Sequence, residues 1–496
     1  MAQKNQQKQS IASKLFGSTK IRAWIAAIEA GLYPMIFYFS ANFPLVNSWA
    51  HVGYFLAMFI FMPVIVMVLA KLLGGLVIPK WKHLIVPFLN VFFFLFLLKV
   101  CLYAGVQKKM ILVIIMIAGL AAFFLHKHLS KLVVLQFLLA ILGMTSLIPQ
   151  IVNEVNYNDS WTQLPDAIEE VTLKTTPNIY VIQPDGYVNF SELSRGYYAI
   201  DNSKFESFVA DAGFKHYPNF TSNYASTLTS NSATFMMKHH YYNGAKNFSE
   251  GIRMRDQIVT NNPVLDILKN NEYETTILTE NYYLMLNRPE LGYDNSNVDY
   301  KEIPFIGTGL GDSKDIVDAL KSNFSVSRKP QFFFLEFLMP AHIAGRAAVT
   351  KGKDEERTIW EEKLQIANEK LEALITTINK RDPNALVVIM ADHGGFVGME
   401  YTEQIYSRTT DKDIVKSIFS SNLLIKWPNN EAPAFDTLLK SSVNLFRVLF
   451  AHLSGDNALL NNLEDNSSYV ILKDTKNNGV YKYLDNEGRV VFERLD

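Results

Sequence analysis

Most of the long apolar runs of this chain lie within its first 150 residues. A helix needs about 20 consecutive apolar residues to cross a bilayer, and one run, VGYFLAMFIFMPVIVMVLA, carries no charge at all. Several such runs in succession favour membrane-spanning helices over buried core helices. The pattern therefore predicts a transmembrane domain at 23–150 with about five helices. They are expected at roughly 23–43, 52–70, 84–104, 110–125 and 132–150.

Lysine and arginine are unevenly distributed between the two sides of these predicted helices. The N-terminal tail at 1–22 and the loops after the second and fourth helices carry most of them, whereas the loops on the opposite side carry only Lys108 and Lys109. Because cytoplasmic loops are enriched in lysine and arginine, the tail is expected to lie in the cytoplasm. An odd number of spans then places everything after residue 150 outside the cytoplasm.

The chain after residue 150 has a different pattern. Residues 151–176 are polar and mixed, and they are expected to form a linker near the membrane surface. From 177 onward, apolar stretches typical of strands alternate with helical patterns; the clearest strands are NIYVIQPDGY, PQFFFLEFLMPAH and ALVVIMADHGG. This alternation predicts an exported α/β domain at 177–496, with a mostly parallel sheet between helices.

A long amphipathic helix is predicted directly before the last of these strands. In its sequence, RTIWEEKLQIANEKLEALITTINKR, the apolar residues include Leu364, Ile366, Leu371 and Leu374. An apolar stripe of this kind is typical of a helix that packs on a sheet through one face.

Charge and cysteine content limit the possible partners and the cellular location of the protein. The formal net charge is −1, so the sequence implies no nucleic-acid partner. The only cysteine, Cys101, lies inside a predicted span, which leaves the exported domain without a disulfide. This favours a bacterial cell membrane, with the exported face periplasmic or extracellular, over a eukaryotic secretory route.

Three of the predicted strands end in side chains that bind metals. Asp185 follows IYVIQP, His342 follows FFFLEFLMPA, and Asp392 and His393 follow LVVIMA. If the strands are parallel neighbours, these side chains converge at one edge of the sheet, where open α/β folds place their ligands. Carboxylate and imidazole ligands suit one divalent metal ion, with zinc or manganese as the expected choices.

A nucleophile is expected in SNYASTLTSNSATFMM (222–237), where several hydroxyl groups precede an apolar run. Serine and threonine are favoured at helix starts as caps, so a purely structural role is one interpretation. The functional interpretation uses the same geometry, because backbone N–H groups at a helix start bind phosphate. A metal beside that point can activate a hydroxyl.

The ordered set of Asp-Gly, hydroxyl-rich helix start, strand with histidine and Asp-His-Gly resembles the alkaline-phosphatase-like superfamily. Within it, the layout is similar to the sulfatase-like membrane enzymes, including lipoteichoic acid synthases and lipid A phosphoethanolamine transferases. PNIYVIQPDGY resembles the family's opening strand, ADHGG its metal motif, and SSNLLIKWPNN (420–430) the later strand before the closing helix. The resemblance covers about 177–455, together with the membrane-spanning layout.

The resemblance implies roles for individual residues. Asp185, Thr227, Asp392 and His393 would hold the metal, with Thr227 as the nucleophile and Ser230 three residues on. Thr229 with Ser232 is the alternative register; Thr227 is preferred because SNYxxT resembles related sulfatase-like membrane proteins. His342 would contact the substrate phosphate or the leaving group. Arg346 could help to hold an anion, although a surface role is the simpler interpretation.

The implied activity is a phosphotransferase reaction that moves a phospho-head group from a membrane phospholipid to an envelope glycan or lipid. The Cys-x-Pro-x-Arg pattern of sulfatases is absent from the sequence, which disfavours sulfate ester hydrolysis. Two alternatives stay open: a membrane-anchored phosphodiesterase or sulfatase that uses water, and an inactive scaffold of an envelope polymer machine. The stretch KHHYY (238–242) is interpreted as solvated or substrate-channel residues rather than as metal ligands.

Overall fold

A computed structural model describes residues 22–244, 253–307, 309–324, 328–474 and 476–495. The predicted cytoplasmic tail, apart from Arg22, lies outside the described residues. The chain forms two compact units. The first, called here the N-terminal unit, comprises the residues up to Tyr157 together with the segment 303–309; the second, the C-terminal unit, comprises 158–302 and 310–496.

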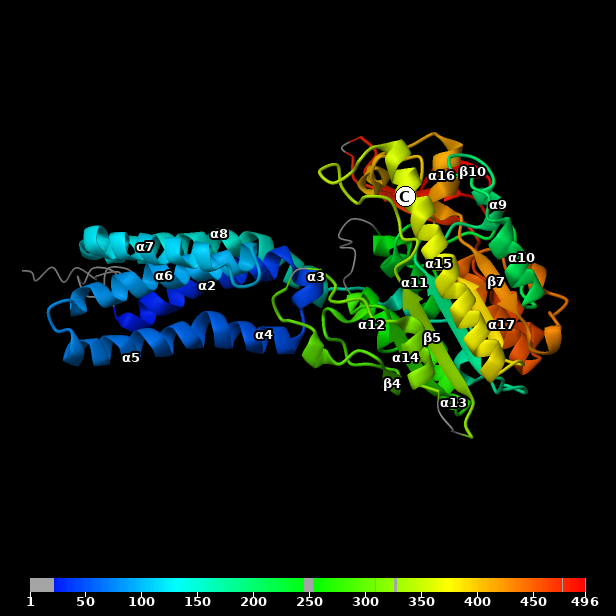
Figure 1. The fold of residues 1–496 in the computed structure, drawn as a ribbon, viewed down its shortest axis with the longest axis horizontal. Coiled ribbons are helices and arrows are strands. Elements are labelled where there is room, and N and C mark those ends of the chain that lie inside the picture. Colours follow the sequence, from blue (N-terminus) through cyan, green and yellow to red (C-terminus); the bar gives the residue numbers. More distant parts are fainter. Residues whose placement is uncertain (1–21, 245–252, 308, 325–327, 475, 496) are drawn as a thin grey trace, which may run out of the picture. The chain divides into compact units, whose positions relative to one another are not determined.

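The N-terminal unit is built from helices alone in its described part. Helix α2 packs against α5, α6 and α8, and α6 packs against α7 (Figure 1). A π-helical turn, η1, joins α4 to α5, so that Trp49–Val77 is one continuous helical run. The elements are α2 (Ala23–Ala41), α3 (Phe43–Val46), α4 (Trp49–Phe55), η1 (Leu56–Phe61), α5 (Met62–Val77), α6 (Lys82–Leu102), α7 (Lys108–Leu125), η2 (His126–His128) and α8 (Leu129–Val155).

Four helical runs of this unit are long and apolar enough to cross a membrane, which indicates an integral membrane protein. Helices lie at all five predicted positions, but α7 and α8 belong to a single run, Lys108–Thr162, interrupted by the short 3-10 turn at His126–His128. Five separate crossings are therefore not confirmed. The side of the membrane on which each loop lies stays a prediction.

Two amides tie three of these helices together. Asn90 of α6 donates to the carbonyl of Ala26 in α2 at 2.7 Å, and it exchanges hydrogen bonds with Gln136 of α8 at 2.9 and 3.1 Å. Both side chains are buried. Among apolar helices, such paired amides fix which faces meet, because an unpaired amide in hydrocarbon is costly.

The C-terminal unit contains a seven-stranded sheet in the order β2-β7-β6-β1-β5-β3-β4. The five strands β6, β1, β5, β3 and β4 are parallel, whereas β7 and β2 each run antiparallel to their neighbour. The mostly parallel sheet is thus confirmed. The strands are β1 (Ile179–Pro184), β2 (Lys215–His216), β3 (Glu274–Thr279), β4 (Asn295–Ser296), β5 (Gln331–Phe337), β6 (Leu386–Met390) and β7 (Leu423–Lys426).

The central strands are largely apolar, with Gln183 of β1 and Gln331 and Glu336 of β5 as polar exceptions. Every residue of β1, β5 and β6 is buried, which is the pattern expected of central parallel strands. The α-helices of this unit are α9 (Phe190–Leu193), α10 (Ser203–Asp211), α11 (Thr227–Met236), α12 (Met254–Val259), α13 (Pro263–Asn270), α14 (Ile316–Ser322), α15 (Lys353–Arg381), α16 (Lys412–Phe419) and α17 (Leu445–Ser454).

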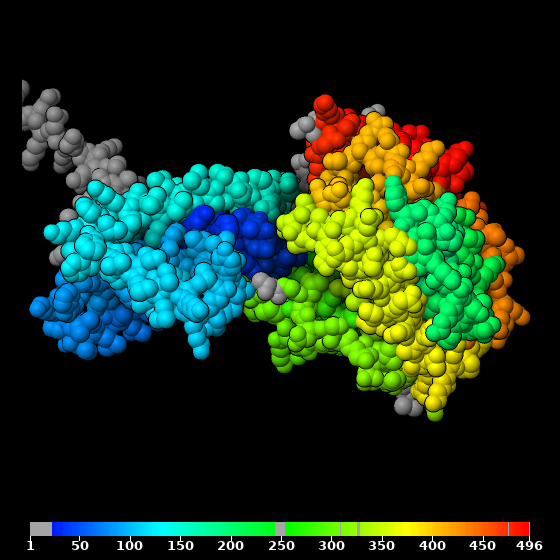
Figure 2. Space-filling view, turned by 45° about the horizontal axis from the view of Figure 1, so that its top comes forward, coloured from blue at the N-terminus to red at the C-terminus, as the bar shows by residue number. Residues whose placement is uncertain are grey.

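Helix α15 lies beside α10 on the surface of this unit, as Figure 2 shows in yellow and green. Of the apolar residues singled out in its sequence, Leu364, Leu371 and Leu374 are completely buried in the core. Ile366 is 42% exposed, because it is two residues from Leu364 and therefore about 200° away around the helix. The predicted helix is confirmed, but Ile366 does not lie on its buried face.

Three strands near the C-terminus form a small antiparallel sheet: β8 (Ser468–Leu472), β9 (Gly479–Leu484) and β10 (Val490–Leu495). Tyr469 of β8 donates its backbone N–H to the carbonyl of Asn223, and Ser468 donates its hydroxyl to the carbonyl of Ser222. These contacts hold the small sheet against the segment that leads into α11.

Candidate metal centre

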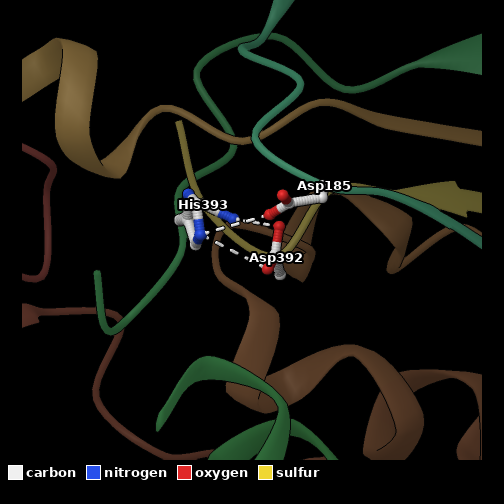
Figure 3. A group of neighbouring side chains, drawn as sticks. All are labelled: Asp185, Asp392 and His393. Atoms are coloured by element: carbon white, nitrogen blue, oxygen red, sulfur yellow. Dashed lines mark hydrogen bonds and ion pairs between the residues drawn. The ribbon is translucent and has the colours of Figure 1, made fainter. Parts of the chain in front are cut away.

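Two neighbouring parallel strands deliver the candidate ligands to one point. Strands β1 and β6 pair with Ile182 opposite Ile389, so both end at the same level of the sheet. Asp185 follows β1, and Asp392 and His393 follow β6. One ligand atom from each of these three side chains lies within 4.8 Å of the other two, and all three side chains are buried (Figure 3). The predicted convergence of these three residues is therefore present.

The turn after β1 depends on a glycine. Gly186 has a φ of +66°, and a Cβ at this position would lie 2.4 Å from the carbonyl oxygen of Ala341. In return, Ala341 donates its N–H to the carbonyl of Asp185 at 2.8 Å. Only glycine combines this backbone conformation with so close an approach. The turn that presents Asp185 is thereby locked to the turn that presents His342.

Asp392 uses its two carboxylate oxygens differently. Its Oδ1 accepts the backbone N–H groups of Gly186 at 3.1 Å and of His393 at 3.0 Å. Its Oδ2 is buried and has no hydrogen-bond partner within the described residues. A buried carboxylate oxygen without a donor is costly, and a bound cation removes that cost.

The imidazole of His393 is held in the tautomer that binds metals. Its Nδ1 donates to the carbonyl of Gly394 at 2.8 Å, since a carbonyl can only accept. Nε2 therefore carries the lone pair, and it lies 3.4 Å from Oδ1 of Asp185 and 3.4 Å from Oδ2 of Asp392. A backbone carbonyl that fixes the second nitrogen is the usual support of a ligating histidine.

The charges of this group also favour a cation. Burial, and next the negative charge of Asp392, raise the pKa of the Asp185 carboxyl. Two buried carboxylates without a cation repel each other, whereas a divalent ion between them would reverse the effect. The donor set of two carboxylates and one imidazole matches the preferences of zinc and manganese. These residues therefore fit one divalent metal ion.

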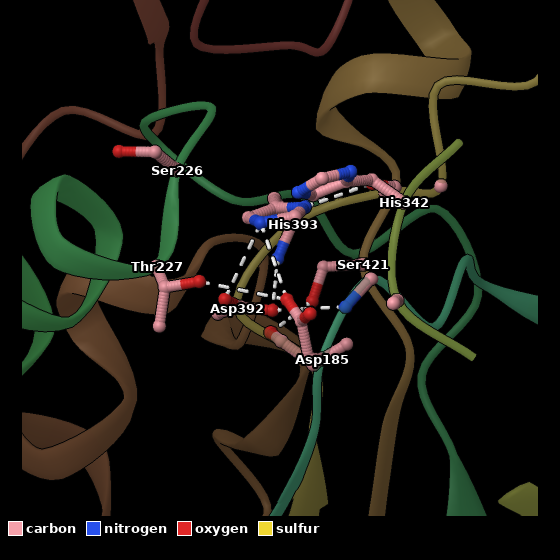
Figure 4. Close-up of polar contacts among 12 residues, drawn as sticks. Asp185, Ser226, Thr227, His342, Asp392, His393 and Ser421 are labelled. Carbon is pink, nitrogen blue, oxygen red and sulfur yellow. Dashed lines mark hydrogen bonds and ion pairs between the residues drawn. The ribbon is translucent and has the colours of Figure 1, made fainter. Parts of the chain in front are cut away.

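Thr227 is the hydroxyl residue that the fold brings to this group. It is half-buried at the first position of α11, and its Oγ1 lies 3.5 Å from Oδ1 of Asp185 (Figure 4). Thr229 is completely buried, and its hydroxyl donates to the carbonyl of Ser226 at 3.1 Å while Ser226 Oγ lies 2.7 Å from it. Of the two registers that the sequence left open, the geometry favours Thr227.

A pocket of about 150 Å³ opens beside Thr227. His342 and His393 line it with Thr227, and the remaining walls include the aromatic side chains of Tyr283, Phe396 and Tyr406. Nδ1 of His342 donates to the carbonyl of Ile343 at 2.6 Å, which leaves Nε2 unprotonated. Burial is the main cause of the lowered pKa of His342, so its imidazole is a neutral base.

Two further residues from the sequence lie outside this group. Ser230 is completely buried in α11, with a hydroxyl that has no partner within the described residues, and it does not line the pocket. Arg346 is 78% exposed and pairs with Glu403 at 3.2 Å. Glu403 lines the pocket, whereas Arg346 does not. Arg346 is therefore linked to the pocket only through its ion pair with Glu403.

The fold also brings Glu336 of β5 to this region, which the sequence interpretation missed. Glu336 is fully buried, and neither of its carboxylate oxygens has a hydrogen-bond partner within the described residues. Burial, followed by the charges of Asp185 and Asp392, raises its pKa well above the ordinary value. Its neighbour in the sheet, Gln183, is equally buried and unpartnered. A single acidic residue inside the apolar run FFFLEFLM was the signal available in the sequence.

The two histidines of the stretch KHHYY, by contrast, are buried in the fold. His239 and His240 are buried, at 1% and 2% exposure, and His240 stacks on Tyr224 with ring centroids 3.8 Å apart. Neither histidine belongs to the metal group. The solvated interpretation is therefore wrong for these two histidines, because the chain turns at Met237 and places His240 against Tyr224. Tyr241 is 39% exposed, and a substrate-channel role of the stretch stays a prediction.

Comparisons with known proteins reveal distant structural similarity. No protein-family model and no curated protein matches the chain. Among solved structures, it is similar to the C-terminal periplasmic domain of EcEptC from Escherichia coli, with 12% identity and a TM-score of 0.43 over 65% of this chain and 97% of that one. That domain has also been solved in complex with Zn.

A second similar structure is the integral membrane protein lipooligosaccharide phosphoethanolamine transferase A (EptA) from Neisseria meningitidis. The identity is 12% and the TM-score 0.43, over 86% of this chain and 95% of that one. A third, the glycosaminoglycan-metabolism protein BT33494S-sulf from Bacteroides thetaiotaomicron, has 14% identity and a TM-score of 0.42 over 64% of this chain and 88% of that one. At such low identities, the chemistry of this chain has to be judged from its own side chains.

Proposed function

We propose that this chain is a metal-dependent membrane phosphotransferase. It moves a phospho-head group from a membrane phospholipid to an envelope glycan or lipid, and a phosphothreonine at Thr227 is the intermediate. The observation that carries the proposal is the position of Thr227, whose Oγ1 lies 3.5 Å from Oδ1 of Asp185 at the start of a ten-residue helix. Its setting in a bacterial cell membrane, with the C-terminal unit on the exported side, belongs to the same proposal.

Asp185, Asp392 and His393, joined by the hydroxyl of Thr227, would hold one divalent ion. When bound, such an ion lowers the pKa of a hydroxyl and neutralises charge on a phosphoryl group. The first backbone N–H groups of α11 have no partners inside the helix, so they point towards an anion at Thr227. The phosphoryl group of the donor would lie at this helix start.

The first half-reaction exchanges one P–O bond for another. Oγ1 of Thr227 forms a bond to phosphorus as the bond from phosphorus to the diacylglycerol oxygen breaks. The proton leaves Thr227 and ends on the diacylglycerol oxygen. His342, with a neutral imidazole and a free Nε2 in the same pocket, is the base that passes it on.

The second half-reaction is the reverse with a different alcohol. An acceptor hydroxyl attacks phosphorus, the bond to Oγ1 of Thr227 breaks, and the proton of the acceptor returns to Oγ1. His342 acts as the base again. A two-step covalent route of this kind gives ping-pong kinetics.

The test is the intact mass of the full-length protein in detergent, after incubation with phosphatidylethanolamine or phosphatidylglycerol and zinc or manganese. The wild type is expected to gain the mass of one head-group phosphate and to release diacylglycerol, whereas Thr227→Ala gains nothing. Thr358→Ala is the matched control, because Thr358 is exposed on α15 in the same unit. Adduct formation by Thr227→Ala would contradict the proposal.

The acceptor is tested in the same assay. A transferase releases diacylglycerol much faster when a hydroxyl acceptor is present, and the head group is recovered on that acceptor. Equal release in water alone, with free phosphorylated head group as the product, would establish a phosphodiesterase instead. Absence of bound metal and of any turnover would support the inactive scaffold.

A further inference from the structure

A second and larger cavity lies in the C-terminal unit, away from the catalytic pocket. It measures about 670 Å³, within the range of cavities that bind small ligands. Its walls come from the end of β2, the C-terminal half of α16, the loop 436–440 and the turn between β9 and β10. It shares no lining residue with the pocket at Thr227.

The two cavities open at the same edge of the sheet. Strand β2 runs antiparallel to β7, and β7 runs antiparallel to β6, so β2 and β6 point in the same direction. Since neighbouring strands lie about 4.8 Å apart, the end of β2 is about 10 Å from the end of β6. Thr221 lines the larger cavity and Thr227 the catalytic pocket, and six residues of chain span at most about 20 Å.

The larger cavity has an excess of positive charge. Four cationic side chains line it, against the two acidic side chains of Asp436 and Glu487. Both acidic groups already have cations, since Lys215 pairs with Asp436, and Arg489 pairs with Glu487 at 2.9 Å and with Asp485 at 2.7 Å. A concave wall focuses the field of the cations that remain, so the cavity attracts anions.

Two of the four cationic side chains form no ion pair with an acidic side chain in the described part of the chain, although Glu192 and Asp485 lie near one of them, Lys416. Lys416 is half-buried and donates to the carbonyl of Gly488, and Lys440 is exposed with no side-chain hydrogen bond or ion pair among the described residues. The other two, Arg195 and Lys215, are engaged by Glu192 and Asp436. Lys416 and Lys440 are therefore the two lining cations that an anionic group in the cavity could pair with.

The remaining walls suit a saccharide. The amides of Asn219 and Asn486 and the hydroxyl of Thr437 are exposed to the cavity, next to the flat face of Pro218. Amides and hydroxyls exchange hydrogen bonds with sugar hydroxyls in both directions, which a site built for a small inorganic anion does not need. The volume of about 670 Å³ also exceeds what inorganic phosphate alone would fill.

We propose that this cavity binds an anionic saccharide and that this saccharide is the acceptor of the phospho-group. The role as acceptor rests on the proposed function. Lys416 and Lys440 would hold its acidic groups while the amides hold its hydroxyls. The segment 221–227 would then lead one end of the bound saccharide towards Thr227. The site is a specificity site, remote from the reacting atoms.

The test is calorimetric titration of the full-length protein in nanodiscs with tetragalacturonate, and with neutral maltotetraose as the matched sugar. We expect tetragalacturonate to bind, with an affinity that falls as salt is added, and maltotetraose to bind at least tenfold more weakly. Lys440→Glu should weaken tetragalacturonate at least tenfold and Lys440→Gln by less. Lys380→Glu, an exposed lysine of α15 outside the cavity, should leave the affinity unchanged.

Equal affinity of Lys440→Glu and Lys380→Glu for tetragalacturonate would overturn the inference. Complete displacement of tetragalacturonate by an equal concentration of inorganic phosphate would overturn it as well. The same titration with Thr227→Ala separates the two proposals, because the affinity should be retained there. Binding without release of diacylglycerol would leave the cavity site standing and refute the proposed function. Release of diacylglycerol without saccharide binding would refute the cavity site and leave the proposed function standing.

Discussion

Nε2 of His393 lies 3.4 Å from Oδ1 of Asp185, although the two residues stand at the ends of different strands. The distance is set by backbone, since β1 and β6 are paired in register and Gly186 turns the chain immediately after Asp185. It is short enough for one ion to reach both side chains. The metal centre is therefore built into the pairing of two strands and does not depend on a flexible loop.

Removal of one ligand should abolish metal binding. Asp392→Asn keeps the shape of the side chain and its accepting oxygen for Gly186 and His393 but loses the negative charge. We expect the bound metal, measured by mass spectrometry of the purified protein, to fall at least tenfold. Asp354→Asn, an exposed acidic residue of α15, is the control and should retain full metal. Undiminished metal in Asp392→Asn would show that the ion lies elsewhere.

Gly186→Ala should distort the centre without touching a ligand. The new Cβ would meet the carbonyl of Ala341 at 2.4 Å on a backbone with positive φ, so the free energy of unfolding should drop by about 2 kcal/mol. Metal affinity should fall as well, because the turn carries Asp185. Gly345→Ala is the control, since a Cβ there meets nothing within 4 Å. Thermal unfolding with and without metal measures both effects, and equal behaviour of the two variants would contradict the account.

Asp166 holds the start of the C-terminal unit to α17. Arg447 is 1% exposed, and its two terminal nitrogens lie 2.6 and 3.1 Å from the carboxylate of Asp166. Asp166→Ala would leave a buried guanidinium without its anion, which costs about 3–5 kcal/mol. Chemical denaturation should register this loss. Glu355→Ala, which breaks an exposed pair with Lys351, should change stability by less than about 1 kcal/mol.

Acid should destabilise the C-terminal unit through its buried histidines. Burial lowers the pKa of His239 to about 4 and that of His240 to about 3, although the nearby carbonyl and charge of Asp465 oppose the shift at His239. Below pH 6.5 the unfolded chain binds protons that the folded chain does not, so stability present above pH 6.5 is lost as the pH falls towards 4. For His239 alone the loss is on the order of 3 kcal/mol.

The measurement is the thermal midpoint between pH 7.5 and 4.5 for the wild type and His239→Gln. Glutamine keeps a donor for the carbonyl of Asp465 and an acceptor for the hydroxyl of Tyr224, the two partners of His239. The variant should lose less stability on acidification than the wild type. An identical pH slope would mean that His239 does not carry the effect.

The regular secondary structure of this protein could be predicted from local sequence patterns. Runs of about 20 apolar residues can be stable only in a membrane or a large core, and alternating apolar strands and amphipathic helices pack well only as an α/β sheet. Asp185, Asp392 and His393 could be named in advance because each directly follows a buried strand, and the ends of neighbouring parallel strands meet. Local patterns are sufficient for such statements, since strand and helix periodicity are properties of adjacent residues.

The other features depend on how segments far apart in the chain pack together. The choice between Thr227 and Thr229 depends on a rotation of about 200° between residues two apart on one helix, and only the position of α11 against β1 determines which hydroxyl faces Asp185. Glu336 was missed, and His239 and His240 were wrongly expected to be solvated, because burial of a polar side chain depends on distant segments that cover it. The cationic cavity likewise gathers side chains from six separate segments, and their meeting is a property of the folded unit.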